Sequence, residues 1–75
     1  MGNVRYSVVV DWDTADKLFV ATVPALSVST YGETREEAME KVREAIAVTV
    51  EGLRAAGQPV PHGDTGRVEI VEVEV

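Results

Sequence analysis

The sequence predicts an α+β domain of two layers, in which one helix covers one face of a four-stranded, mostly antiparallel sheet. Three observations lead to this prediction. Residues 4–31 contain three segments of strand-like composition separated by turn residues, residues 35–56 carry a helical repeat of apolar residues, and residues 67–75 return to strand composition. The expected order is therefore β-β-β-α-β within a single domain, residues 1–75.

The first strand is predicted over residues 4–12, where apolar residues alternate with a mixed set. One face carries Val4, Tyr6, Val8, Val10 and Trp12, and the other carries Arg5, Ser7, Val9 and Asp11. The mixed face is a candidate surface for dimerisation. An Asp-rich turn leads to a second strand over residues 18–23, which Pro24 ends because proline cannot donate to a ladder. A third, short strand over residues 28–31 is expected at an edge of the sheet.

The helix predicted over residues 35–56 begins with a capping box. The Thr34 hydroxyl can accept from the Glu37 N–H, and the Glu37 carboxylate can accept from the Thr34 N–H. Gly32 is expected to give the backbone freedom to turn before the helix, and Gly57 is the expected C-terminal stop. The predicted buried stripe consists of Ala38, Val42, Ala45, Ile46, Thr49, Val50 and Leu53.

The last strand, predicted over residues 67–75, has an apolar pattern that changes phase. Val68 and Ile70 fall on one face, whereas Val71, Val73 and Val75 fall on the other. Either a β-bulge near Ile70 and Val71 restores the phase, or both faces are covered, one of them by another subunit. If a meander of three strands is followed by a helix that returns the chain, this strand runs parallel to the first.

The chain is acidic, small and free of cysteine. It carries 7 Lys and Arg against 13 Asp and Glu, a formal net charge of −6. The basic residues are scattered, so we expect no direct binding of nucleic acid, whereas an acidic chain suits a basic protein partner. Without cysteine or a long apolar run, we expect a cytoplasmic protein that does not span a membrane. We also expect a homo-oligomer, a dimer or larger, because a domain of this size buries only roughly 60–65% of its unfolded surface.

No group of residues converges on catalytic, cofactor-binding or metal-binding chemistry, so we expect neither an enzyme nor a cofactor. His62 is the single histidine, and no second histidine, cysteine or nucleophile completes a catalytic set with it. The aspartates at positions 11, 13 and 16 lack the glycine and the distal glutamate of a calcium loop. Asp11, Asp13 and Asp16 therefore fit turn-forming residues better than metal ligands.

Three further features of the sequence carry residues that could form a site. The carboxylates of the last strand, Glu69, Glu72 and Glu74, straddle the phase change and do not share one face. The triplet Asp64-Thr65-Gly66 matches aspartic proteases but lacks their apolar strands, so it is read as a coincidence. The aromatic residues Tyr6 and Trp12 are expected in the core. An exposed Trp12 or Tyr31 would instead be a candidate interface hot spot.

Several short motifs together resemble the HicB-like antitoxin family. After the Val-rich strand that Tyr6 opens, they are Phe19-Val20-Ala21-Thr22-Val23-Pro24-Ala25-Leu26, Tyr31-Gly32-Glu33-Thr34-Arg35-Glu36-Glu37-Ala38, Ala45-Ile46 and Leu53-Arg54-Ala55-Ala56-Gly57-Gln58-Pro59-Val60-Pro61. The resemblance covers about residues 4–61. It implies a domain of the partial double-stranded-RNA-binding or RNase H-like type, and a non-enzymatic module that sequesters a small basic ribonuclease toxin.

Many members of this family continue into a helix-turn-helix or ribbon-helix-helix that binds operator DNA. After Pro61 only a short loop and one strand follow here. The chain therefore resembles a short, solitary member without the DNA-binding domain. The alternative is a solitary homo-oligomer with a structural or regulatory role and no toxin partner.

Overall fold

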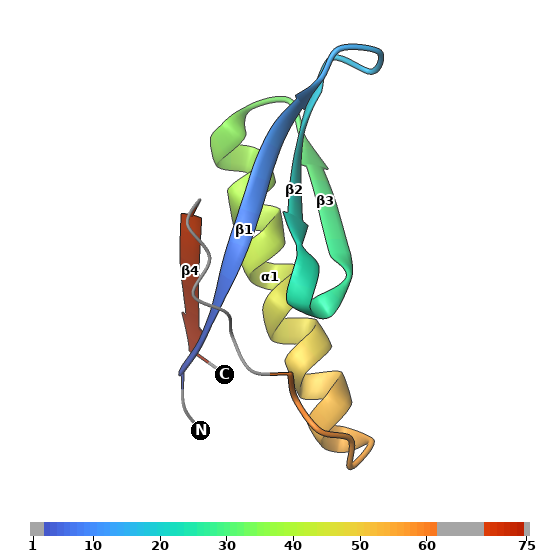
Figure 1. Cartoon of the computed structure of the whole chain (residues 1–75), viewed down its shortest axis with the longest axis vertical. Coiled ribbons are helices and arrows are strands. Elements are labelled where there is room, and N and C mark those ends of the chain that lie inside the picture. The colour runs from blue at the N-terminus through green and yellow to red at the C-terminus, as the bar shows by residue number, and fades with distance from the viewer. Residues whose placement is uncertain (1–2, 62–68, 75) are drawn as a thin grey trace.

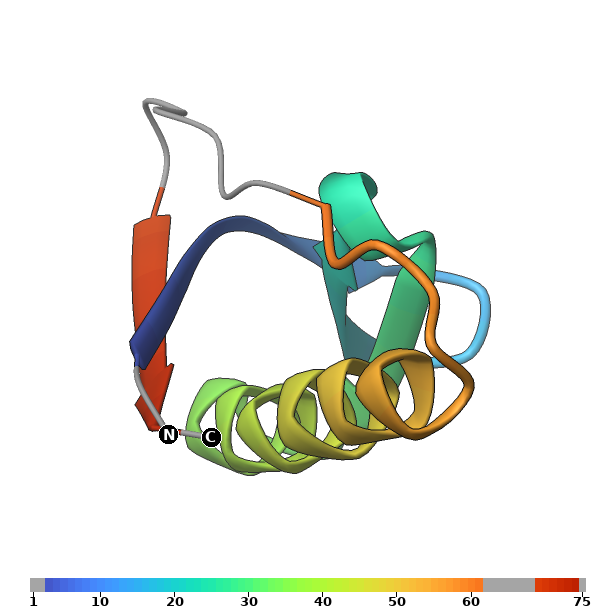
Figure 2. The same cartoon turned by 90° about the horizontal axis from the view of Figure 1, so that it is seen from below.

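A computed structural model describes residues 3–61 and 69–74. The elements in chain order are β1 (Asn3–Asp13), β2 (Leu18–Val23), the 3-10 helix η1 (Pro24–Leu26), β3 (Val28–Gly32), α1 (Arg35–Ala55) and β4 (Glu69–Glu74). The helix α1 lies across one face of an antiparallel sheet (Figures 1 and 2). The predicted α+β class is therefore confirmed, and the bounds of the helix agree with the prediction to within one residue.

The three strands β1, β2 and β3 form an antiparallel meander, and β4 is added along the other side of β1, which gives the order β3-β2-β1-β4. The third strand lies at an edge, as predicted. β4 is antiparallel to β1, so the predicted parallel arrangement is wrong. That prediction assumed that the helix alone brings the chain back to the end of the sheet where β1 begins. Instead α1 and β4 run in the same direction (Figure 1), and the 13 residues between Ala55 and Glu69 are long enough to span the sheet again.

The pairing of β1 with β4 runs without interruption from Asn3↔Glu74 to Val8↔Glu69. A bulge would place two residues of one strand opposite one residue of the other. Of the two alternatives for the phase change, the bulge near Ile70 and Val71 is therefore wrong, since Ile70 pairs with Ser7 and Val71 pairs with Tyr6. The other reading of the phase change, a strand covered on both faces, stays a prediction.

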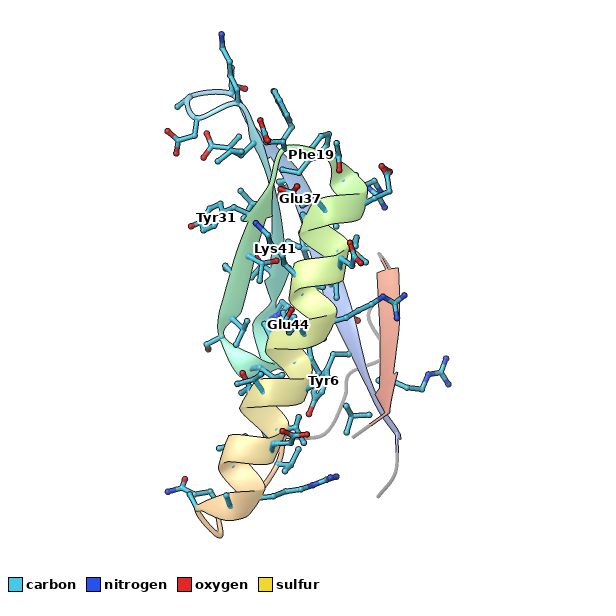
Figure 3. All side chains as sticks on the ribbon, turned by 180° about the vertical axis from the view of Figure 1, so that it is seen from behind. Tyr6, Phe19, Tyr31, Glu37, Lys41 and Glu44 are labelled. Carbon is cyan, nitrogen blue, oxygen red and sulfur yellow. The ribbon has the colours of Figure 1, made fainter. Side chains whose placement is uncertain are left out.

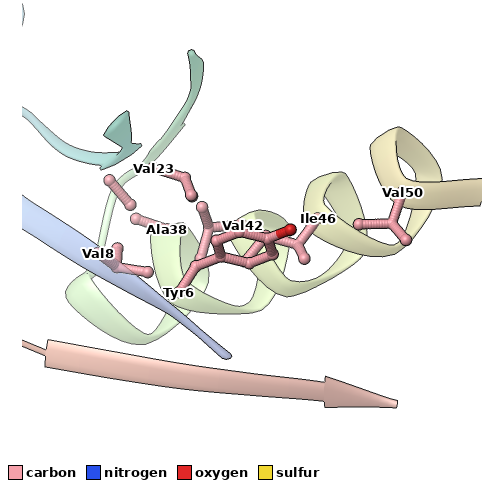
Figure 4. Packing of buried hydrophobic residues seen from close by; sticks show 8 residues of the cluster. Tyr6, Val8, Val23, Ala38, Val42, Ile46 and Val50 are labelled. Carbon is pink, nitrogen blue, oxygen red and sulfur yellow. The ribbon is translucent and has the colours of Figure 1, made fainter. Parts of the chain in front are cut away.

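The core lies between α1 and the sheet (Figure 4). Its fully buried side chains are Tyr6 and Val8 from β1, Ala21 and Val23 from β2, and Ala38, Val42, Ile46 and Val50 from α1. The helical members recur every four residues, so they form one narrow ridge along the helix. Of the wider stripe predicted from the sequence, Ala45, Thr49 and Leu53 are only partly buried. Burying each valine contributes about 1.5–3 kcal/mol relative to leaving it exposed.

Both ends of α1 are closed by hydrogen bonds. The Glu37 N–H donates to Thr34 Oγ1 at 3.0 Å, as predicted. The Glu37 carboxylate, however, accepts from the Glu33 N–H at 3.0 Å and not from the Thr34 N–H. At the C-terminus, Gly57 adopts a φ of +71°, and its N–H donates to the Arg54 carbonyl at 3.0 Å. This left-handed glycine confirms the predicted stop.

Gly32 has a different role from the predicted one. Among the described glycines only Gly57 has a positive φ, so Gly32 supplies no unusual turn. Instead α1 passes close behind it, and a Cβ at this position would lie 2.5 Å from the Ala38 nitrogen. The glycine is required because the first turns of the helix touch the end of β3.

Candidate functional site

An exposed aromatic pair lies at the end of the β1–β2 hairpin. Trp12 and Phe19 are partners in the antiparallel register, and their rings meet edge to face with centroids 4.9 Å apart and an interplanar angle of 64°. Phe19 is partly buried against the core, whereas Trp12 is 50% exposed. The predicted burial of Trp12 is wrong because α1 starts only after β3 has ended, and the hairpin extends beyond the start of the helix (Figure 1).

The turn beside this pair is organised by Asp13. Its Oδ1 accepts from the Ala15 N–H at 3.0 Å and from the Asp16 N–H at 3.2 Å. Lys17 closes the turn with a φ of +56°. Asp13 is thus a turn-forming residue, as predicted, while Asp11 and Asp16 are exposed. Within residues 3–61 and 69–74, no group of three or more metal-ligating side chains could hold a metal ion.

The start of α1 lies at the same end of the molecule as the hairpin turn (Figures 1 and 3). We call residues 11–19 and 33–37 together the hairpin end. It carries six carboxylates against two basic residues, Lys17 and Arg35. The remaining described side chains between residues 4 and 61 show the opposite balance, three carboxylates against four basic residues. Six of the 13 carboxylates of the chain, but only two of its 7 Lys and Arg residues, therefore belong to the hairpin end.

Two of the six carboxylates also have structural roles. Asp13 holds the hairpin turn, and Glu37 caps the helix while its Oε1 lies 3.7 Å from Lys41 Nζ. The other four residues, Asp11, Asp16, Glu33 and Glu36, are exposed. The site therefore combines a half-exposed tryptophan with exposed carboxylates at the same end of the molecule, which suits an arginine-rich or lysine-rich surface.

Tyr6 is fully buried, as predicted. Its hydroxyl donates to the Pro61 carbonyl at 2.7 Å. Burial raises the pKa of the Tyr6 hydroxyl above its ordinary value, and the positive charge of Arg54 lowers it in part. The group is a structural tie between β1 and the segment after α1.

The mixed face of β1 is not uniformly exposed. Arg5 and Asp11 are exposed and Val9 is partly buried, whereas Ser7 is only 5% exposed and its hydroxyl has no hydrogen-bond partner among residues 3–61 and 69–74. On the same side of the sheet, Tyr31 of β3 is 52% exposed. The role of this face in dimerisation stays a prediction.

The remaining predicted candidates fall outside the described part of the chain. These are His62, the triplet Asp64-Thr65-Gly66 and the side chains of Glu69, Glu72 and Glu74. The grouping of carboxylates at the hairpin end was not predicted from the sequence. The signal was available, because in a meander of three strands the first turn and the end of the third strand lie at the same end of the sheet.

The fold and the site define a small α+β domain with an exposed aromatic residue and exposed carboxylates at one end. No family model and no solved structure matches the chain. A UPF0150 protein of Thermoplasma acidophilum is 29% identical over 68 residues, which cover 89% of this chain and 97% of that protein. The chain is therefore similar to a UPF0150 protein over nearly its whole length. Within residues 3–61 and 69–74, no helix has the length and hydropathy needed to cross a membrane.

Proposed function

We propose that this chain is a HicB-like, non-enzymatic protein-binding module of antitoxin type, which captures a small basic protein through the hairpin end. The observation that carries the proposal is the exposed Trp12 at the hairpin end, which also carries six carboxylates. The HicB-like motifs and the similarity to a UPF0150 protein support the assignment. The motifs also suggest the class of the partner, a small basic ribonuclease.

The geometry suits such a partner for two physical reasons. Clustered carboxylates attract a basic protein over distance and raise the rate of encounter, which falls as salt screens the charges. A large aromatic side chain at the centre of a contact loses its water on binding and is typical of residues that dominate affinity. Trp12 is already oriented by its contact with Phe19, so little side-chain freedom is lost when a partner covers it.

The experiment that tests the proposal compares three forms of the full chain as bait in lysate from the native cells. They are the wild type, Trp12→Ala, and the control Val48→Ala, which truncates a side chain that is 62% exposed on α1. We expect mass spectrometry to identify a small basic protein that the wild type and the control retain and Trp12→Ala loses. Recovery of the chain alone, or equal retention by all three baits, contradicts the proposal.

The ribonuclease class is tested with the purified partner. We expect the partner to degrade RNA by itself, and its activity to disappear when the wild-type chain is added in equimolar amount. Trp12→Ala is expected to need a concentration at least tenfold higher for the same inhibition, since loss of a hot-spot residue costs about 2 kcal/mol or more. If the captured basic protein has no ribonuclease activity, the result supports the protein-binding module and contradicts the proposal that its partner is a ribonuclease toxin.

The second candidate function is a homo-oligomer that has a structural or regulatory role and no toxin partner. The exposed edge strand β3 with Tyr31 favours it. The two candidates are separated by the lysate experiment above, because a chain with no partner recovers only itself.

A further inference from the structure

The sheet has two edges that differ sharply in charge. The edge strand β4, with the sequence EIVEVE, contains three glutamates in six residues. The edge strand β3, with the sequence VSTYG, contains no charged residue and no proline in five residues. Charges and prolines are the usual means by which an edge strand avoids pairing with another sheet.

We propose that β3 pairs in antiparallel fashion with β3 of a second copy of this chain, so that two sheets join into one across a two-fold axis. An edge strand has one row of backbone N–H and C=O groups without a partner strand, and a second copy satisfies them. This inference concerns a surface other than the hairpin end and does not depend on the proposed basic partner.

The negative charge of the chain favours pairing of two copies through β3 over pairing through β4. Each copy carries a formal net charge of −6, so two copies repel wherever their acidic surfaces meet. Pairing through β4 would bring three glutamates of each copy into one interface. Pairing through β3 places only valine, serine, threonine, tyrosine and glycine of the two strands opposite each other. Like charges placed opposite each other across a sheet are destabilising, so the uncharged edge is the favourable one.

The sequence of β3 also fits its own copy. A five-residue strand overlaps its antiparallel copy fully when the axis passes through its middle residue, Thr30. Thr30 then pairs with Thr30 of the second copy, and Ser29 pairs with Tyr31 of the second copy. Ser29 and Tyr31 are both exposed on the sheet face away from α1, whereas Thr30 donates a 3.0 Å hydrogen bond to the Ala38 carbonyl on the helix side. The register therefore covers part of the exposed tyrosine ring.

The helix flank that lies toward this edge carries a lysine next to a glutamate of the same helix. Figure 3 shows Lys41 on the flank of α1 that lies toward Tyr31, and Lys41 Nζ lies 3.7 Å from Glu37 Oε1. Ser29 is also tied to its own sheet, since its hydroxyl lies 3.2 Å from Thr22 Oγ1. The strand is thus held in an extended form before a second copy arrives, which lowers the entropic cost of pairing.

The register can be tested with paired charges. In Ser29→Lys/Tyr31→Lys, each new lysine lies opposite a lysine of the second copy, so we expect a monomer. In Ser29→Lys/Tyr31→Glu, each new lysine lies opposite a glutamate, so we expect a dimer. The control Val48→Lys/Ala55→Lys adds the same charge on exposed positions of α1 and is expected to remain a dimer.

The measurement is the molar mass in solution, by light scattering or sedimentation, across micromolar to millimolar concentrations of the full chain. We expect the wild type, the Lys/Glu variant and the helix control to have twice the mass of one chain, and the Lys/Lys variant to have the mass of one. Far-UV circular dichroism checks that each variant is folded. If the Lys/Lys variant does not fold, Ser29→Glu/Tyr31→Glu replaces it with the same expected result.

Three results would overturn the inference. A wild type that stays monomeric at all concentrations shows that no such pairing occurs. A like-charge variant that stays dimeric places the interface elsewhere. A Lys/Glu variant that is as monomeric as the Lys/Lys variant excludes the register centred on Thr30.

Discussion

The Tyr6 hydroxyl of β1 donates a 2.7 Å hydrogen bond to the carbonyl of Pro61, which lies 55 residues away in the segment after α1. The ring of Tyr6 is packed in the core between α1 and the sheet, and Figure 4 shows it beside Val42 and Ile46. One side chain therefore fills the core and also fixes where the chain goes after the helix ends.

Tyr6→Phe is expected to destabilise the domain modestly. The ring stays in the core, so the loss is confined to one hydrogen bond, which contributes about 0.5–1.5 kcal/mol. The measurement is urea unfolding followed by circular dichroism. The control is Tyr31→Phe, which removes a hydroxyl from an exposed ring and should change stability by less than about 0.5 kcal/mol. Equal effects of the two substitutions would show that the hydrogen bond to Pro61 makes no net contribution to the free energy of unfolding.

The same hydroxyl predicts a loss of stability in alkali. Burial raises the pKa of Tyr6 in the folded state above its ordinary value of 10.0, so the folded state disfavours the phenolate. At pH values well below 10 the hydroxyl is neutral in both the folded and the unfolded state, so its contribution to the free energy of unfolding is fully present. As the pH rises above 10, the unfolded chain ionises first and the free energy of unfolding falls. Wild type should therefore lose stability more steeply above pH 10 than Tyr6→Phe, and parallel pH profiles would contradict this.

The sequence predicted the features that depend on neighbouring residues. The helix from Arg35 to Ala55, the Thr34 cap and the Gly57 stop follow from local chemistry, and the structure has all three. The direction of β4 and the exposure of Trp12 depend on where distant segments lie. A pattern of alternating residues gives the two faces of a strand, but it does not show how far the helix extends over each face.

Gly32 and Gly52 should respond in opposite ways to substitution by alanine. At Gly32 the added Cβ would lie 2.5 Å from the Ala38 nitrogen, and because the obstacle is backbone the helix start must move. We expect a loss of about 1–3 kcal/mol, as for other overpacked sites. At Gly52, within α1, the added Cβ would have no neighbour within 4 Å apart from adjacent residues and the backbone of its own helical turns. Gly52→Ala should stabilise the protein by up to about 1 kcal/mol, the usual helix preference for alanine.

Both changes are measured by thermal and urea unfolding of the single variants. Gly52→Ala is the control for the general effect of replacing a glycine in this chain. A neutral Gly32→Ala would mean that α1 can shift away from β3 without cost, which the contact between them argues against.

Thr34→Ala is expected to cost about 1 kcal/mol, because the Glu37 N–H loses the hydroxyl that accepts its bond. Thr34→Ser keeps an acceptor at the same place and should retain most of the stability. The comparison is made by urea unfolding, with helix content followed at 222 nm. If serine is no better than alanine, the cap is not the reason for the loss.

The exposed carboxylates of the hairpin end predict a salt-dependent association with the captured partner. Asp11→Asn/Asp16→Asn removes two charges without touching the Asp13 bonds that hold the turn. We expect slower association at low salt and a weaker dependence of the rate on salt, with little change in the dissociation rate. Glu44→Gln/Glu51→Gln removes the same charge from α1 outside the hairpin end and serves as the matched control. An equal effect of both pairs would show that net charge matters rather than its position.

Ser7→Ala should raise the stability of the domain. Ser7 is 5% exposed and its Oγ has no hydrogen-bond partner in the described part of the chain, so folding takes the hydroxyl from water without a replacement bond from these residues. An unsatisfied buried polar group costs about 1–3 kcal/mol, and alanine removes the group while leaving only a small void. We expect a gain of about 1 kcal/mol in urea unfolding. Ser29→Ala, which removes an exposed hydroxyl on β3, is the control and should be close to neutral. A loss of stability in Ser7→Ala would instead show that the hydroxyl is satisfied in solution.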